Sequence, residues 1–185
     1  MRNGSYCGFA RLMIPPVVIS TDRFLLKSLI PDDVGERYLS WLTDQTVSQY
    51  ISAATLKPSL DSLKQYVQER CEREDVLFLG IFEKNSGIHI GNIKYEPVDS
   101  KNRFAVMGIL IGEASWHGKK VAAEVIVASS KWLNSTRDID EIILGVARSH
   151  KAAIRAYLAA GFKVEVTNRI EIYTNKSIAM VLRYA

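Results

Sequence analysis

The sequence predicts an α/β fold in which helices pack on a mixed sheet. Between residues 76 and 111, apolar runs separated by short polar turns are typical of antiparallel strands. From residue 104 onward the pattern becomes strand, helix, strand, helix, strand. Such alternation is typical of a parallel crossover, because parallel strands need a long connection that is usually helical.

The N-terminal third contains one strand and two helices by pattern. Residues 24–29 suit a first strand, and Pro31 then begins a helix with acidic residues in its first turn. The apolar face of this helix continues to about Leu42. Residues 44–57 are irregular, and a second helix is expected from about Ser59 to Arg73.

The middle of the chain predicts three strands. Residues 76–82 form a continuous apolar run, as expected for a strand that is covered on both faces. Residues 83–87 form a hairpin connection, 88–96 return, 97–103 turn, and 104–111 form the next strand.

The C-terminal part predicts two helices and a closing hairpin. A helix runs from about Val121 to Leu133, with an apolar stripe that fixes it on the sheet. A strand from Glu141 leads to a helix that starts at Ser149 as N-cap, buries Ile154, Tyr157 and Leu158, and ends before Gly161. Residues 165–173 and 177–184 are expected to pair as the closing hairpin.

Length and composition predict one globular domain. We expect residues 1–18 to be an N-terminal extension and residues 19–185 to be a single domain of the 185-residue chain. The net charge of +4 is too small and scattered to indicate a nucleic-acid partner. No apolar run approaches the roughly 20 residues that span a bilayer. Together with the lack of a convincing signal peptide, this favours a cytoplasmic protein without a membrane partner.

Cysteine and histidine usage predicts neither a disulfide framework nor a metal site. Cys7 and Cys71 lie far apart without a CxxC pattern, and the three histidines lack metal-ligand spacing.

One segment carries a functional signal, the turn between the strand at 104–111 and the helix that follows it. It reads Trp116-His117-Gly118-Lys119-Lys120-Val121-Ala122-Ala123-Glu124. A turn that opens a helix presents unpaired N–H groups and the positive end of the helix dipole, and both favour a phosphate. The helices that start near Val121 and Ser149 each follow one of two neighbouring strands. Their starts should therefore lie side by side at the ends of these strands and form one cleft there.

These residues resemble the GCN5-related N-acetyltransferase (GNAT) superfamily, especially its ribosomal-protein-alanine and amino-sugar acetyltransferase-like branch. The similarity covers about residues 19–184 and is strongest over 107–112, 116–124 and 153–162. It implies a mostly antiparallel sheet of six to seven strands, whose fourth and fifth strands form a parallel pair, with about four helices. It also implies acetyl-CoA as donor and an amine as acceptor, in a monomer or a homodimer.

The acetyl-CoA signature of the family, Gln/Arg-x-x-Gly-x-Gly/Ala, falls on His117-Gly118-Lys119-Lys120-Val121-Ala122. His117 replaces Gln or Arg, which matters little because the loop binds pyrophosphate mostly through its backbone. Lys120 replaces the central glycine, which permits unusual backbone angles and close approach of phosphate. Either its side chain points away and adds charge, or acetyl-CoA binding is impaired; we favour the first.

The resemblance assigns further residues to the donor site. The strand residues Ile109, Leu110 and Ile111 should offer backbone groups to pantetheine and polarise the thioester carbonyl. His150 and Ala153 stand where the family often has Asn and Ser. Tyr157 matches the family's tyrosine near the thioester sulfur, where a phenol of pKa near 10 can protonate the leaving thiolate as general acid. Periodicity alone favours Tyr157 as a buried helix aromatic beside Ile154 and Leu158, whereas the surrounding motif favours the general acid.

The general base has the weakest signal. An amine acceptor must lose a proton before it attacks, and Glu113, just after the strand, is our candidate, with Glu96 as the alternative. Both also fit ordinary exposed carboxylates. Two functions therefore remain open. The first is direct acetyl transfer to an amine, either of a small molecule or of a protein N-terminus. The second is a non-catalytic acyl-CoA-binding module, which is suggested by the departures from the family pattern at Lys120, His150 and Ala153.

Overall fold

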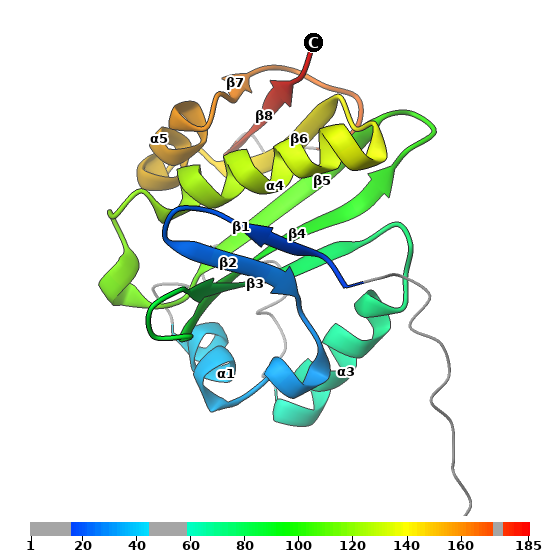
Figure 1. The fold of residues 1–185 in the computed structure, drawn as a ribbon. Helices are drawn as coiled ribbons and strands as arrows, with labels where there is room; N and C mark the ends of the chain where they lie inside the picture. Colours follow the sequence, from blue (N-terminus) through cyan, green and yellow to red (C-terminus); the bar gives the residue numbers. More distant parts are fainter. Residues whose placement is uncertain (1–15, 45–58, 172–175) are drawn as a thin grey trace, which may run out of the picture.

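The computed structural model describes residues 16–44, 59–171 and 176–185, and one eight-stranded sheet runs through them (Figure 1). The strand order is β1-β2-β3-β4-β5-β6-β8-β7. Every neighbouring pair is antiparallel except β5 and β6. The strands are β1 (Val18–Ser20), β2 (Phe24–Ser28), β3 (Leu77–Glu83), β4 (His89–Asp99), β5 (Phe104–Ile111), β6 (Glu141–Ala147), β7 (Lys163–Val164) and β8 (Ser177–Arg183).

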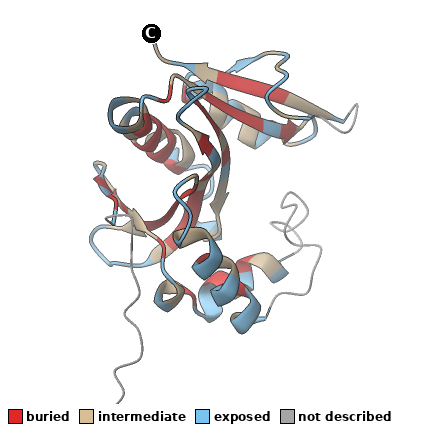
Figure 2. Cartoon of the chain, turned by 90° about the vertical axis from the view of Figure 1, so that its right-hand side faces the viewer, coloured by how far each residue is buried: buried red, intermediate tan, exposed pale blue. Residues whose placement is uncertain are grey.

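The helices divide between the two faces of the sheet. The helices α4 (Val121–Arg137) and α5 (Lys151–Ala159) lie on what we call the upper face, while α1 (Glu36–Thr43) and α3 (Leu60–Cys71) lie on the lower face (Figure 1). Two short 3-10 turns, Pro31–Asp33 and Ala114–Trp116, precede α1 and α4. Buried residues gather along the central strands, and the helices expose their outer sides (Figure 2).

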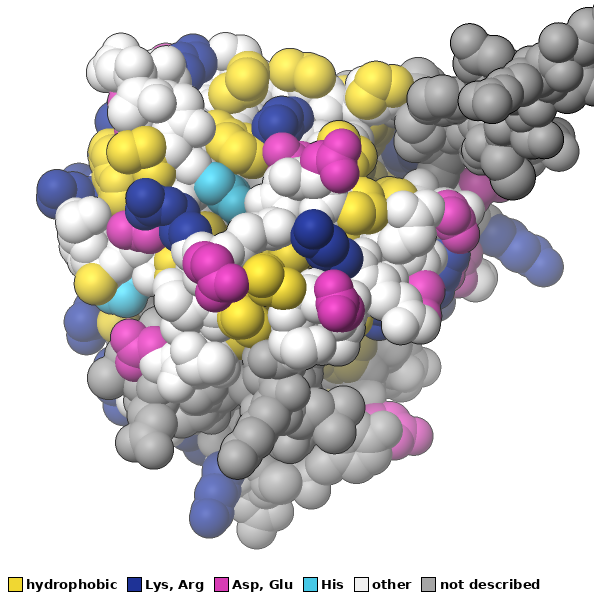
Figure 3. All heavy atoms as spheres, turned by 90° about the horizontal axis from the view of Figure 1, so that it is seen from below, with side chains coloured by type: hydrophobic (Ala, Val, Ile, Leu, Met, Phe, Trp, Pro, Cys, Tyr) yellow, Lys and Arg dark blue, Asp and Glu magenta, His cyan; other side chains and the backbone are white. Residues whose placement is uncertain are grey.

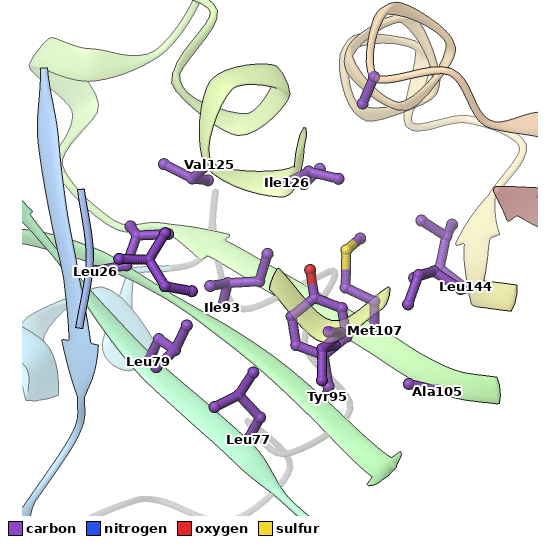
Figure 4. Close-up of a cluster of buried hydrophobic side chains, with 14 of the residues drawn as sticks. Leu26, Leu77, Leu79, Ile93, Tyr95, Ala105, Met107, Val125, Ile126 and Leu144 are labelled. Atoms are coloured by element: carbon purple, nitrogen blue, oxygen red, sulfur yellow. The ribbon is translucent and has the colours of Figure 1, made fainter. Parts of the chain in front are cut away.

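The upper core fixes α4 on the sheet. Figure 4 shows Val125 and Ile126 of α4 above side chains of the strands, among them Leu26 and Ile93, and all four are fully buried. The hydroxyl of Tyr95, also fully buried, lies 2.8 Å from Ser129 Oγ of α4. Burial of these groups sets the direction in which the first turn of α4 points.

The lower core is smaller and is formed by α1 and α3 against β3. Trp41 of α1 is 4% exposed, and its indole lies over Gly112 just after β5. A Cβ atom at Gly112 would stand 1.9 Å from Trp41 Cδ2. The missing side chain at this position therefore allows α1 to pack against the end of β5.

Strands β5 and β6 diverge after a short paired stretch. They pair from Phe104 with Glu141 to Val106 with Ile143. Beyond that point β5 stays paired with β4 as far as Ile111, and β6 stays paired with β8. Over Met107–Ile111, no described residue pairs with the edge of β5 that faces β6, so this part of the strand borders an opening between two strand ends.

The α/β class, the mixed sheet and the parallel pair are confirmed, while several element boundaries were wrong. The sheet has eight strands where six to seven were expected, and the additional one is the edge strand β1, which at three residues is too brief to show a periodic pattern. The helix expected from Pro31 to Leu42 is a 3-10 turn and then α1, separated by Val34 and Gly35. Strand β4 continues past Pro97 through a register shift instead of turning there.

The C-terminal predictions needed four corrections. The residues that pair with β8 are Lys163 and Val164, whereas 165–171 contain no strand, so the hairpin partner was placed too late. Helix α4 continues to Arg137 instead of ending near Leu133. Helix α5 has His150, not Ser149, as N-cap. Leu158, expected to be buried, is 51% exposed. The predictions for residues 1–15, including Cys7, and for residues 45–57 lie outside the described residues.

Candidate active site

The turn of residues 117–122 enters α4 through a left-handed backbone. Lys120 has φ 59° and ψ 20° and is the N-cap of the helix, and Gly118 has φ 74°. Lys120 thus takes the conformation that a glycine adopts without strain, at a cost of about 1–2 kcal/mol for a residue with a Cβ. Its side chain is exposed and forms no ion pair with any described residue.

The amides of the 117–122 turn fall into two groups. The His117 N–H donates to Ala114 O at 3.0 Å, and the Lys119 N–H reaches Trp116 O at 3.4 Å. Four other amides find no acceptor among the residues that the structure describes, those of Gly118, Lys120, Val121 and Ala122. Unpaired donors at the positive end of a helix are what an anion needs. The expected donor set is therefore reduced from six amides to four.

The turn is tied to the end of β5 by a side chain. His117 Nε2 donates to Ile111 O at 2.8 Å, which fixes the proton on that nitrogen. The Gly112 N–H donates to Ile90 O of β4. Because backbone groups alternate in direction along a strand, Ile109 and Ile111 turn theirs away from β4 and Leu110 turns its own toward it. The carbonyl bonded by His117 is thus on the open edge of β5.

Helix α5 brings Tyr157 to the same face of the sheet. Figure 1 shows α5 beside the beginning of α4, and Tyr157 and Ile109 both pack against the upper core. The end of α5 is a Schellman motif, in which the Phe162 N–H donates to Tyr157 O and the Gly161 N–H donates to Leu158 O. Gly161, with φ 97°, supplies the left-handed residue that this motif requires.

The phenol of Tyr157 has the properties of a proton donor. Burial raises the pKa of Tyr157 to about 12, because the phenolate would lose its hydration. The hydroxyl forms no hydrogen bond with any described residue. A phenol that stays protonated at neutral pH and has no protein acceptor is able to give its proton to a bound molecule.

The start of α5 offers fewer groups to a ligand than the start of α4. His150 is its N-cap, and burial lowers the pKa of His150. Its own N–H donates to Ala147 O, while its carbonyl accepts from the Ile154 N–H. Ala153 is half-buried and packs against the upper core, so only its backbone could contact a ligand.

Glu113 is held by α1. Its Oε1 accepts hydrogen bonds from Arg37 Nη1 at 2.7 Å and from Trp41 Nε1 at 3.2 Å. Its Oε2 accepts from no described residue. The carboxylate therefore keeps one oxygen for another donor, next to the end of β5.

Glu96 is surrounded by cations. Lys94 Nζ, Arg70 Nε and Arg73 Nη1 lie 2.6, 3.1 and 2.5 Å from its oxygens. Burial opposes ionisation, but these contacts prevail and lower the pKa of Glu96. A carboxylate committed to three cations suits a structural role better than that of a base.

Sequence reasoning missed the residues that hold the 117–122 turn from outside. Thr21 and Arg23, in and next to the hairpin between β1 and β2, bond Glu124, and Arg23 also bonds Lys119 O. These partners lie about a hundred positions apart in sequence. No local pattern connects them.

One hollow among the described residues lies away from the 117–122 turn. A hollow of about 440 Å³ lies by residues 166–169, Glu141 and Arg183. Because Glu141 pairs with Phe104 at the beginning of β5, this hollow lies at the opposite end of that strand from the 117–122 turn. Among the described residues, no group of His, Cys, Asp and Glu could hold a metal ion, and no helix is long and apolar enough to cross a membrane.

A known protein family matches most of this chain. The family model described as "Acetyltransferase (GNAT) domain" matches residues 23–163. The match spans β2 to β7 and contains the 117–122 turn and Tyr157. The resemblance to the superfamily is thereby confirmed, whereas the branch stays a prediction.

Solved structures show the same fold at low sequence identity. A GNAT-family acetyltransferase from Bacillus anthracis is 15% identical with TM-score 0.75, over 90% of this chain and 98% of that one. Spermidine N-acetyltransferase from Vibrio cholerae, solved with CoA and spermine, is 17% identical with TM-score 0.73, over 87% and 95%. An aminoglycoside acetyltransferase in complex with coenzyme A is 20% identical with TM-score 0.70, over 86% and 94%. The last two of these structures contain coenzyme A, the carrier of the acetyl group in the expected donor.

Proposed function

We propose that this chain, which belongs to the GNAT family of acetyltransferases, transfers an acetyl group from acetyl-CoA directly to a primary amine. The acceptor is an amine of a small molecule, such as an amino sugar, or a protein N-terminus. The observation that carries the proposal is the set of four amides at the beginning of α4 that have no acceptor within the described part of the chain.

These amides suit the diphosphate of the donor. They lie at the positive end of a 17-residue helix that burial holds in one orientation. Lys119 and Lys120 add two exposed cations to the same turn. Lys120 already has the left-handed backbone of the glycine that it replaces, so the substitution leaves the path of the turn intact. This supports the alternative in which Lys120 contributes charge.

The open edge of β5 suits the pantetheine arm. Ile109 and Ile111 turn their backbone groups toward the opening between β5 and β6, and an amide donor there would stabilise the oxyanion of the thioester carbonyl. His117 occupies the carbonyl of Ile111. This bond leaves the N–H of Ile111 untouched, so we assign the donor contact to the N–H groups of Ile109 and Ile111.

The chemistry needs two proton transfers. The amine nitrogen forms a bond to the acetyl carbon, the carbon–sulfur bond breaks, and the thiolate sulfur receives a proton. We assign that proton to the hydroxyl of Tyr157, because a phenol is protonated at neutral pH and α5 brings this one to the same face of the sheet as the opening. The proton that the amine loses goes to a base, for which we retain Glu113, whose Oε2 accepts no hydrogen bond from a described residue. No serine or cysteine nucleophile is required.

Amines of very different size fit the same scaffold. The matched structures are named for spermidine and for aminoglycosides, which share amino groups and little else. On the described part of the face seen from below, where α1 and α3 lie, cationic and acidic side chains are interspersed (Figure 3). That mixture does not favour an acceptor of one charge sign. We therefore assign the acceptor class only as a primary amine.

Calorimetry with acetyl-CoA, followed by CoA release with a panel of amines, tests the proposal. We expect binding, turnover with at least one amine, and a loss in kcat of about 100-fold in Tyr157→Phe, the usual size of a general-acid contribution. The matched control is Tyr184→Phe, whose hydroxyl bonds Ser130 within the fold. Binding without turnover on any amine would favour the acyl-CoA-binding module, and full activity of Tyr157→Phe would remove the general-acid assignment.

A further inference from the structure

Arg23 contacts the 117–122 turn although it lies far away in sequence, just before β2. Its Nη2 donates to Lys119 O at 3.0 Å. Its Nε donates to Glu124 Oε2 at 2.8 Å. One guanidinium therefore joins a carbonyl inside the turn to a carboxylate in the first turn of α4.

The surroundings hold this guanidinium in one place. The Cζ atom of Arg23 lies 4.9 Å from the ring centroid of Phe24 and 6.0 Å from that of Trp116. Those two rings pack edge to face at 5.3 Å, and Phe24 is fully buried. Glu124 Oε1, the second oxygen of that carboxylate, accepts from the backbone N–H of Arg23 at 3.0 Å and from the Thr21 hydroxyl at 2.6 Å.

Glu124 would oppose a bound phosphate if it stood alone. It lies in the first turn of α4, next to the unpaired amides, and its neighbours keep it charged. Burial acts to raise the pKa of Glu124, but the hydrogen bonds from Thr21 and Arg23 prevail and lower it. The cation of Arg23 compensates this negative charge at 2.8 Å.

We propose that Arg23 is a positioning residue for the diphosphate contact of the donor: it holds the carbonyl of Lys119 inward, so that the N–H of Lys120, which belongs to the same planar peptide unit, faces outward, and it neutralises Glu124. The inference rests on the proposed function. Arg23 does not touch the reacting atoms, and its effect is confined to the part of the donor that the 117–122 turn binds.

Two donors separate this role from a general structural one. Acetyl-CoA carries the diphosphate, whereas S-acetylpantetheine carries the same thioester and pantetheine without it. We expect Arg23→Ala to raise the KM for acetyl-CoA about tenfold, which corresponds to about 1.4 kcal/mol. The ratio of kcat/KM for acetyl-CoA to that for S-acetylpantetheine should fall by the same factor.

Arg23→Lys distinguishes geometry from charge. Lysine keeps the cation but lacks the planar fork that reaches two acceptors at once. We therefore expect Arg23→Lys to lose most of the same donor preference while it remains folded. In Arg23→Ala/Glu124→Gln, removal of the uncompensated carboxylate should restore part of the lost affinity for acetyl-CoA. Arg183→Ala, which removes an arginine with two carboxylate partners elsewhere, is the matched control and should keep the wild-type ratio.

The outcomes are distinct. Equal losses with both donors in Arg23→Ala and Arg23→Lys, or no loss with either, would overturn the positioning role alone. A wild-type chain that fails to bind acetyl-CoA would overturn the proposed function, and the positioning role with it.

Discussion

The two faces of the sheet are built by different means. On the upper face, the 117–122 turn presents backbone amides, and the neighbouring side chains mainly hold it in position. On the lower face, charged side chains from separate elements meet one another, as in the pairs of Glu113 with Arg37 and of Glu96 with Arg70. A backbone site tolerates changes in sequence, because main-chain groups are the same for every residue. An arrangement of side-chain ion pairs, by contrast, changes with each substitution.

The largest effect on stability is expected where α1 meets the end of β5. Gly112→Ala places a methyl group within the ring of Trp41, and forced overpacking of this kind costs about 1–3 kcal/mol. Urea denaturation would measure the loss. Gly108→Ala is the matched control, because a Cβ there meets nothing within 4 Å. Equal stability of the two variants would show that α1 is not anchored at Gly112.

A smaller effect is expected at Glu96. Glu96→Gln leaves Lys94, Arg70 and Arg73 without their common carboxylate, and we expect a loss of about 1–2 kcal/mol at pH 7.

The pH dependence of that loss has a defined sign. The folded-state pKa of Glu96 lies below its ordinary value of 4.5, so its contribution is present above about pH 4.5 and disappears as the pH falls through the folded value. Urea denaturation between pH 7 and pH 3 should therefore show the difference between wild type and Glu96→Gln shrinking in acid. Glu36→Gln, which removes an exposed carboxylate, should cost at most about 0.5 kcal/mol. A difference that stays constant with pH would contradict the charged role of Glu96.

The smallest effect is expected on the upper face. Lys120→Gly removes left-handed strain but adds freedom to the unfolded chain, and we expect a net gain of about 0.5–1 kcal/mol. Acetyl-CoA should bind a few-fold more weakly at low salt and almost equally at high salt, because the lost charge is screened. Unfolding curves and calorimetry at two salt concentrations would measure both. Lys119→Gly, at a residue without positive φ, should lose affinity without gaining stability, and a stabilised Lys119→Gly would refute the strain argument.

The same contrast explains which site residues could be predicted from sequence. The 117–122 turn and Tyr157 lie in contiguous motifs, so their spacing alone brings them to one helix start and one helix face. Glu113 was visible only as a charged residue after a strand, and its bond to Arg37 depends on how α1 packs. Arg23 carried no signal, because its partners are about a hundred positions away.

The sequence by itself determined the class of the fold, the order of its main elements and the helix start at Val121, because each depends on periodicity and on residues close together in the chain. Only the tertiary structure decided the short edge strands, the divergence of β5 from β6, and which amides of the turn remain unpaired. Lys120 illustrates the division. The sequence shows a lysine where a glycine was expected, and only the packed fold, with α4 held on the sheet and Arg23 on the carbonyl of Lys119, determines that this lysine adopts the backbone of a glycine.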